Sequence, residues 1–194
     1  MNATQQYSLG ILAGGQGRRW GGRDKGLVIH LGEPLVARMC LPRPQQSERL
    51  ICCTHHPHFY QHFADRVLCD SQPGQGPCAG IVALLTAATT ESMIILPVDL
   101  IGAPENVIET LEREWRDTDT AIVLYSETQR HSPCLRLRRS ALDTCQAYVD
   151  EDGRRLLELY ALLDARQVIV PTQWLSDADT PEALSEANPA GTAA

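Results

Sequence analysis

The sequence predicts an α/β protein, a three-layer α/β/α arrangement around a mostly parallel, Rossmann-like sheet. Short apolar runs alternate with helical patterns through most of the 194 residues. A glycine-rich basic stretch follows the first apolar run, and an aspartate follows each of two later ones, as expected where parallel strands end at one ligand-binding edge. No repeat or linker divides the chain, so we expect one domain over 1–194, with flexible ends at 1–7 and 188–194.

Each element has a local signal. The run MIIL at 93–96 is continuously apolar, as in a central parallel strand. The other expected strands are 8–12, 50–53, 67–69, 120–125 and 167–170, with a short extended piece at 27–31 and an edge or antiparallel strand at 132–137. The first expected helix has Pro34 at an early helical position and is cut short by Pro42 and Pro44. Further helices are expected from Ile81 onward, over 105–115, 138–148 and 153–163, and after Thr180 as an N-cap.

Composition narrows the possible functions. Hydrophobic residues at 43% and charged residues at 21% are ordinary for a globular protein. A net charge of −7 argues against nucleic acid as a partner, and no apolar run approaches the length of a membrane span. We see no signal peptide, and the seven cysteines are odd in number and contain no C-x-x-C pair. We therefore expect a cytoplasmic protein with reduced thiols.

The segment LAGGQGRRWGGRDKG, residues 12–26, combines glycines with three arginines and a lysine. Glycine lets backbone N–H groups approach phosphate oxygens, and the cations balance phosphate charge. The segment is neither of the two common phosphate loops. A dinucleotide fingerprint would need glycine at Trp20, and a P-loop would need Ser or Thr after Lys25, where Gly26 stands. The alternative, a basic surface loop without a ligand, would leave the cost of ordering it uncompensated.

LAGG, RR-W-GG and DKG, followed by LGEPL, resemble the opening of the molybdenum cofactor guanylyltransferases, with Trp20 where that family usually has Met. A later segment, GQGPCAG, resembles the family's G-P-L-A-G with Cys78 in place of Leu. The resemblance extends over about residues 9–184 and implies a sheet of the nucleotidyltransferase type.

The resemblance also implies an activity. GMP would pass from GTP to the phosphate of molybdenum-molybdopterin, giving the molybdopterin guanine dinucleotide cofactor and pyrophosphate, with Mg²⁺ as the metal. LAGG favours GTP over CTP in this family, and molybdoenzymes or their chaperones are further implied partners. Two alternatives stay open: a cytidylyl- or sugar-1-phosphate nucleotidyltransferase, and a non-catalytic nucleotide-binding regulator or cofactor carrier.

Three residues carry the expected chemistry. Asp99 follows the apolar strand at 93–96 and matches the family's aspartate in P-x-D, which implies a Mg²⁺ ligand that also contacts the nucleotide; otherwise it is a turn or capping residue. Lys25 is expected to reach the phosphates, and Arg19 to act as the second cation, unless these cations are only solvated.

The nucleotide is expected to meet mainly backbone. Leu12, Ala13 and Gly14 should lie against the base and ribose, Gly15 is expected to bind the nucleotide beside them, and Asp70 matches a family position that contacts the nucleotide. Asp70 is otherwise an ordinary turn residue at a strand end.

The chain departs from the family pattern at several places. Cys52 stands about where the family has a nucleotide-contacting Asn, so that role is not transferred. The closing F-x-N-x-N-T-P segment reads LSDADTP, and its two aspartates, Asp177 and Asp179, would either assist a metal or cap the helix. Ser132 stands near a family histidine.

Two further clusters have competing interpretations. Arg154 and Arg155 resemble a family basic pair that meets the acceptor's phosphate, but could equally be a solvated helix start. Four histidines lie within residues 55–62, which could suggest zinc or copper; without a recognised ligand spacing we favour a solvent-facing loop.

Overall fold

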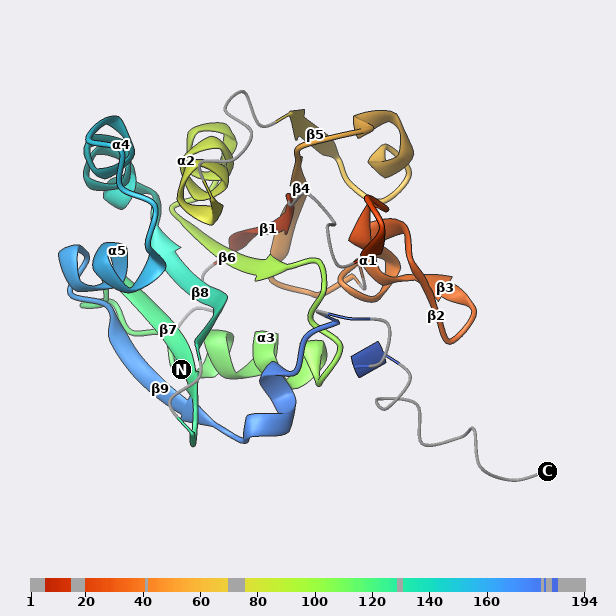
Figure 1. Cartoon of the computed structure of the whole chain (residues 1–194). Helices are drawn as coiled ribbons and strands as arrows, with labels where there is room; N and C mark the ends of the chain where they lie inside the picture. Colours follow the sequence, from red (N-terminus) through yellow and green to blue (C-terminus); the bar gives the residue numbers. More distant parts are fainter. Residues whose placement is uncertain are drawn as a thin grey trace.

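The computed structural model describes residues 6–14, 20–40, 42–69, 76–128, 131–178, 180, 183 and 184. Within these residues a seven-stranded sheet has the order β5-β4-β1-β6-β8-β7-β9, and β2 and β3 form a separate antiparallel pair (Figure 1). The strands are β1 (Tyr7–Ala13), β2 (Ile29–His30), β3 (Glu33–Pro34), β4 (Gln46–Cys53), β5 (Arg66–Cys69), β6 (Ser92–Pro97), β7 (Ala121–Ser126), β8 (His131–Arg138) and β9 (Arg166–Val170).

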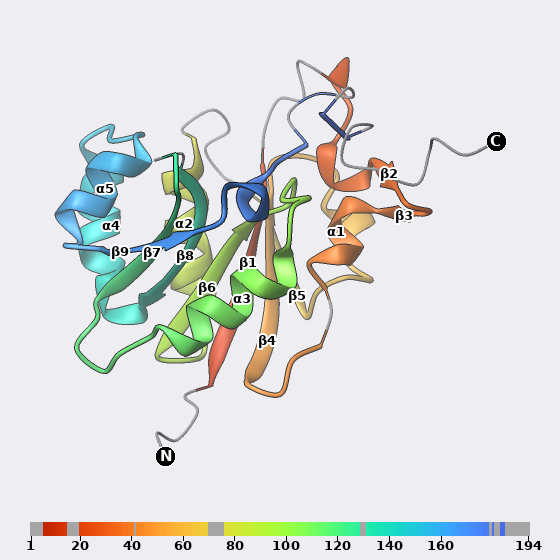
Figure 2. The same cartoon turned by 90° about the horizontal axis from the view of Figure 1, so that it is seen from below.

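Helices cover both faces of the sheet, which confirms the expected three-layer arrangement (Figure 2). The α-helices are α1 (Leu35–Arg38), α2 (Pro77–Ala87), α3 (Pro104–Arg113), α4 (Leu142–Asp150) and α5 (Leu156–Leu162). The 3-10 helices are η2 (Lys25–Leu27), η3 (Pro57–Tyr60), η4 (Arg139–Ala141) and η5 (Thr172–Leu175). No helix among the described residues is long and apolar enough to cross a membrane.

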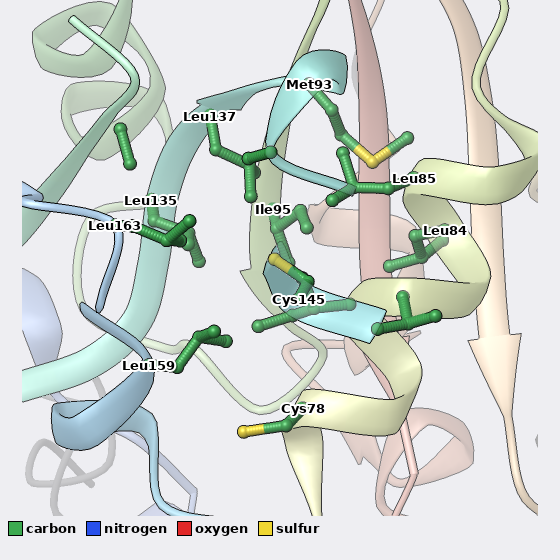
Figure 3. Packing of buried hydrophobic residues seen from close by; sticks show 14 of the residues in the cluster. Cys78, Leu84, Leu85, Met93, Ile95, Leu135, Leu137, Cys145, Leu159 and Leu163 are labelled. Carbon is green, nitrogen blue, oxygen red and sulfur yellow. The ribbon is translucent and has the colours of Figure 1, made fainter. Parts of the chain in front are cut away.

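Two apolar cores lie on the two faces of the sheet. On one face α2, α4 and α5 pack against β6 and β8, as the side chains from Cys78 to Leu163 in Figure 3 show. On the other face α1 and α3 cover β1, β6 and β7. Glycines allow α2 to pack closely: a Cβ at Gly80 would lie 2.7 Å from Leu12 Cδ2, and one at Gly10 would lie 3.0 Å from Leu84 Cδ1.

The expected strands are present with small shifts at their ends, but β8 is not at an edge. It lies between β6 and β7 and runs antiparallel to both, so the antiparallel alternative is confirmed and the edge alternative is wrong. Its inner position agrees with the full burial of Leu135 and Leu137. Buried Tyr7 already belongs to β1, so the expected flexible segment 1–7 is one residue too long at its end. Residues 1–5 and 188–194 lie outside the described residues.

Three local expectations need correction. Residues 27–31 are not one extended piece, because Leu27 ends η2, only 29–30 form β2, and Leu31 begins the turn between β2 and β3. Pro34 is the N-cap of α1 rather than a helical residue, and α1 ends at Arg38, before either proline that was expected to stop it. The 153–163 helix starts only at Leu156, because its N-cap Arg155 is still extended.

All seven cysteines are free thiols, and five of them are buried, in agreement with the expectation of reduced core and loop residues. The sheet also contains a topological switch point. From β1 the strand order leads to β4 on one side and to β6 on the other, and such crevices at carboxyl ends of strands are where open α/β sheets bind ligands.

Candidate active site

The carboxyl ends of β1 and β6 are joined by a backbone hydrogen bond. The Val98 N–H donates to the Leu12 carbonyl oxygen at 3.0 Å. Leu12 and Ala13 are buried, whereas Gly14 is exposed, so the chain leaves the sheet at this glycine. A Cβ on Gly14 would lie 3.3 Å from Thr54 Cγ2 after β4. The backbone predicted to meet base and ribose therefore lies at the switch point, while the contact itself stays a prediction.

Lys25 and Asp99, which the sequence placed on separate elements, form an ion pair. The Lys25 Nζ lies 2.8 Å from Asp99 Oδ2. Lys25 begins η2, and Asp99 occupies the turn after β6. Their side chains are 24% and 19% exposed, so a ligand arriving from solvent can reach both. The arrangement presents a carboxylate to a cation and an ammonium group to a phosphate at one point.

Asp24 and Tyr60, which the sequence analysis did not single out, fix the backbone beside Lys25. The Asp24 carboxylate caps η2 by accepting from the Gly26 N–H at 3.1 Å, and it also accepts a hydrogen bond from the Tyr60 hydroxyl. Burial, together with this bond, raises the pKa of Tyr60, so the hydroxyl stays a neutral donor. A Cβ on Gly26 would overlap the Tyr60 hydroxyl oxygen, which explains the glycine.

Of Asp24 and Tyr60, only Asp24 had a signal in the sequence. An aspartate immediately before a short helical turn is a recognisable N-cap, so Asp24 could have been found. Tyr60 lies 36 positions away along the chain in η3, and no periodicity links it to the loop.

Three predicted site residues lie outside the described residues: Gly15, Arg19 and Asp70. Cys69, the residue before Asp70, ends β5 and pairs in register with Cys53 at the end of β4. The expected strand end is therefore present, and the roles of Gly15, Arg19 and Asp70 remain predictions.

The basic pair is exposed and locally paired. The Arg154 guanidinium lies 2.6 Å from Asp152, and that of Arg155 lies 3.1 Å from Glu158. The turn is nevertheless near the loop edge of the sheet, because a Cβ at Gly76, just before α2, would lie 3.4 Å from the Arg154 carbonyl oxygen. The solvated-helix-start interpretation accounts for both side chains, and the acceptor contact stays a prediction.

The closing segment returns to the site. Asp177 forms an isolated antiparallel bridge with Leu100, next to Asp99. The Thr180 hydroxyl accepts from the Ala183 N–H at 3.2 Å, as an N-cap does, so the expected cap is confirmed at this threonine. Asp179 lies outside the described residues, and a metal role for either aspartate is untested.

The histidine run follows β4 and faces solvent. His55, His56, His58 and His62 are all exposed, and His55 Nδ1 lies 2.9 Å from the Thr54 hydroxyl. Among the residues that the structure describes, no group of three or more His, Cys, Asp or Glu side chains could hold a metal ion.

The donor set suits one kind of metal. Mg²⁺ in nucleotide-using enzymes is held by one or two carboxylates together with substrate phosphates, so a single accessible carboxylate at Asp99 is sufficient on the protein side. A zinc ion held by protein alone would need three or four ligands. The residues present therefore fit Mg²⁺ shared with a nucleotide.

A glycine-rich segment after β1, an acidic turn after β6 and, within the described residues, one antiparallel strand in an otherwise parallel sheet define an α/β protein of the nucleotidyltransferase type. The chain belongs to the family of MobA-like NTP transferase domains, whose sequence model matches residues 9–167.

Several relatives share one description, molybdenum cofactor guanylyltransferase. The chain is 39% identical to that of Pseudomonas putida strain GB-1 over 125 residues, which are 63% of this chain and 65% of the relative. It is 30% identical to that of Shewanella amazonensis over 92% of this chain and 89% of the relative. The match spans less than two thirds of the length of the Pseudomonas relative.

Solved structures share the fold. Molybdopterin-guanine dinucleotide biosynthesis protein A from Archaeoglobus fulgidus superposes with a TM-score of 0.73 at 21% identity, covering 93% of this chain and 96% of the other. The inositol-1-phosphate CTP transferase from T. maritima reaches 0.74 at 11% identity, covering 97% and 98%. At these identities the likeness shows the fold alone.

Proposed function

We propose that this protein is a Mg²⁺-dependent guanylyltransferase that transfers GMP from GTP to the phosphate of molybdenum-molybdopterin, forming the guanine dinucleotide cofactor and pyrophosphate. The observation that carries the proposal is the Lys25–Asp99 pair at the switch point. The names of the Pseudomonas and Shewanella relatives support the choice of reaction.

The reaction needs charge neutralisation and alignment more than covalent chemistry by the protein. An acceptor phosphate oxygen forms a bond to the α-phosphorus of GTP, and the bond from that phosphorus to the bridging oxygen breaks as pyrophosphate leaves. Asp99 would hold Mg²⁺, which supplies positive charge beside the phosphates. Lys25 can turn from Asp99 to a phosphate, because an ammonium group is a compact charge on a flexible stem.

The remaining contacts complete the proposal. The backbone of Leu12, Ala13, Gly14 and Gly15 would lie against the nucleotide, with Asp70 nearby and Arg19 as the second cation. The loop geometry on both sides of Lys25, fixed by Asp24 and Tyr60, supports a preformed phosphate contact. Seven free thiols fit a reducing compartment, which supports a cytoplasmic enzyme whose product passes to molybdoenzymes or their chaperones.

The choice of base does not follow from the fold. The CTP-bound synthetase of CMP-2-keto-3-deoxy-manno-octonic acid superposes at a TM-score of 0.71, close to the 0.73 of the archaeal biosynthesis protein. Preference for GTP is therefore supported by the names of the curated relatives and by the LAGG segment.

Calorimetry with GTP and CTP, each with and without Mg²⁺, tests the nucleotide half of the proposal. We expect Mg²⁺-dependent binding of GTP and much weaker binding of CTP. Pyrophosphate release on adding GTP and molybdopterin then tests catalysis. CTP preference would move the protein to the cytidylyltransferases, and GTP binding without pyrophosphate release would indicate a non-catalytic nucleotide-binding protein.

A further inference from the structure

The C-terminal segment supports the turn that carries Asp99. The Ala178 N–H donates to the Asp99 carbonyl oxygen at 2.8 Å, and the Ile101 N–H donates to the Ser176 carbonyl oxygen at 2.9 Å. Residues 176–178 thus bond to the chain at Asp99 and again just after it. The segment comes from β9 at the far edge of the sheet and runs back toward the side of α1, β2 and β3 (Figures 1 and 2).

The two chains approach each other too closely for a side chain just beyond this point. A Cβ at Gly102 would overlap the backbone carbonyl oxygen of Gln173 and crowd that of Trp174. The next residue, Ala103, donates its N–H to the Trp174 carbonyl at 3.2 Å. The crossing is therefore backbone against backbone, which leaves the Asp99 turn little freedom to shift alone.

Trp20 joins this support to the glycine-rich loop. Its indole Nε1–H donates to the Ala178 carbonyl oxygen at 3.0 Å. The same residue, Ala178, donates its own N–H to Asp99. Trp20 precedes Lys25 in one loop, and Lys25 bonds to the Asp99 carboxylate. The contacts therefore form a closed circuit from Trp20 through Ala178 and Asp99 to Lys25 and back along the chain.

Apolar side chains surround the indole. A third buried cluster, separate from the two cores of the sheet, brings together residues from the helix after β3, the turn after β6 and the C-terminal segment. Its members are Leu35, Ile101, Ala178 and Leu184, with Trp20 and Val28 packed against them. Apolar surface around the indole–carbonyl bond limits competition by water and so strengthens it.

We propose that Trp20 is a positioning residue: its hydrogen bond to Ala178 holds the Asp99 turn at a fixed distance from Lys25. A metal ion held by Asp99 and a phosphate bound by Lys25 would then lie side by side. The inference rests on the proposed function and deepens it. The bond needs the indole, because an apolar side chain such as methionine at this position has no side-chain N–H to donate.

Trp20→Phe tests the bond while keeping an aromatic ring. A net hydrogen bond is worth about a three- to tenfold change in an equilibrium constant, so we expect the Mg²⁺ concentration for half-maximal turnover to rise by about that factor. We expect kcat to fall and KM for GTP to change less, because Trp20 acts through Asp99. Trp115→Phe is the matched control, because Trp115 stacks on Arg136, whose guanidinium bonds Ser92 at the opposite end of β6 from Asp99. This variant should leave the Mg²⁺ dependence unchanged.

A measurement on folded protein keeps the test decisive if Trp20→Phe does not fold. The indole N–H signal of Trp20 in a ¹⁵N NMR spectrum is expected to exchange slowly with solvent and to move in Asp99→Asn, while the signal of Trp115 stays in place. If Trp20→Phe does not fold, and the Trp20 indole N–H signal of the otherwise unchanged chain has the same chemical shift with and without Asp99→Asn, the positioning role is overturned.

The outcomes separate this inference from the function it rests on. Wild-type protein without Mg²⁺-dependent GTP binding or pyrophosphate release would contradict the proposed function. Active wild type with a Trp20→Phe variant of unchanged Mg²⁺ dependence and unchanged kcat would contradict the positioning role alone. A raised Mg²⁺ requirement with a wild-type melting temperature would support it.

Discussion

Two ion pairs at opposite edges of the sheet differ in geometry and in exposure, as a pair proposed to meet a ligand should differ from a structural one. Lys25 and Asp99 meet at the carboxyl edge, through an ammonium group and one carboxylate oxygen at 2.8 Å. Asp119 and Arg166 meet at the amino edge, before β7 and at the start of β9, through two parallel bonds of 2.9 and 2.7 Å. Both pairs join segments distant in sequence, but only the second is a two-pronged fork.

The surroundings differ as much as the geometry. Asp119 is 7% exposed and also accepts the Arg116 N–H at 2.8 Å. Burial opposes ionisation of Asp119, but hydrogen bonds from Arg166 and Arg116 outweigh it and lower its pKa. Asp99 is 19% exposed, so a cation can approach it. A saturated fork resists exchange of partners, whereas a lysine can leave one carboxylate oxygen for a phosphate.

The largest effect we expect is on turnover. Asp99→Asn keeps the size of the side chain and removes its charge, so pyrophosphate release with Mg²⁺ should fall about 10²–10³-fold, while the melting temperature changes little. Activity assays beside thermal unfolding would measure both. Near-normal turnover with Mg²⁺ would show that Asp99 is not the metal ligand.

The same substitution at the Asp119–Arg166 pair should lower stability and leave turnover unchanged. Asp119→Asn leaves the partly buried Arg166 guanidinium without its charged partner, so the free energy of unfolding should fall by about 2–4 kcal/mol. Turnover of the protein that remains folded should stay at the wild-type level. Chemical denaturation measures the free energy of unfolding. A loss of turnover without a loss of stability would contradict a structural role for the Asp119–Arg166 pair.

A carboxylate network at the amino edge predicts a pH dependence. Glu48 accepts hydrogen bonds from Ser8, from the backbone and side chain of Thr89, and from Arg66. Burial opposes ionisation, but these bonds lower the pKa of Glu48 to about 2.

Since the folded-state pKa lies below the unfolded value of about 4.3, the stabilisation is complete above that value and is lost as pH falls toward 2. We expect about 2 kcal/mol of unfolding free energy to disappear over this range, and Glu48→Gln to flatten the profile. Unfolding measured at several acidic pH values checks this, and a Glu48→Gln profile as steep as wild type would contradict it.

The smallest effect separates the fork from the charge. Arg166→Lys keeps the positive charge beside Asp119 but loses the parallel bonds, so the free energy of unfolding should fall by about 1 kcal/mol. Comparison with Asp119→Asn in the same denaturation series would show how much of the pair depends on geometry. Equal losses in both variants would contradict this expectation, because they would mean that the whole contribution of the pair depends on the fork and that the remaining charge contributes nothing.

Much of the fold could be predicted because its signals are local. The apolar run at 93–96 became β6, and the glycine-rich segment after β1 contained the lysine that reaches the site. The inner position of β8 could not be predicted, since the alternation that marked it is shared by edge strands and inner antiparallel strands alike. Strand order depends on which elements pack together, and local periodicity carries no record of it.

From the sequence we could predict most strands and helices and a phosphate-binding segment, because residue type and spacing carry these signals, and the family resemblance implied the roles of Lys25 and Asp99. Only the folded chain reveals that these two side chains pair, that Tyr60 supports Asp24, and that Trp20 reaches Asp99 through Ala178. Trp20 and Ala178 are 158 positions apart. Contacts between distant segments are set by packing of the whole chain, and packing leaves no pattern in either segment.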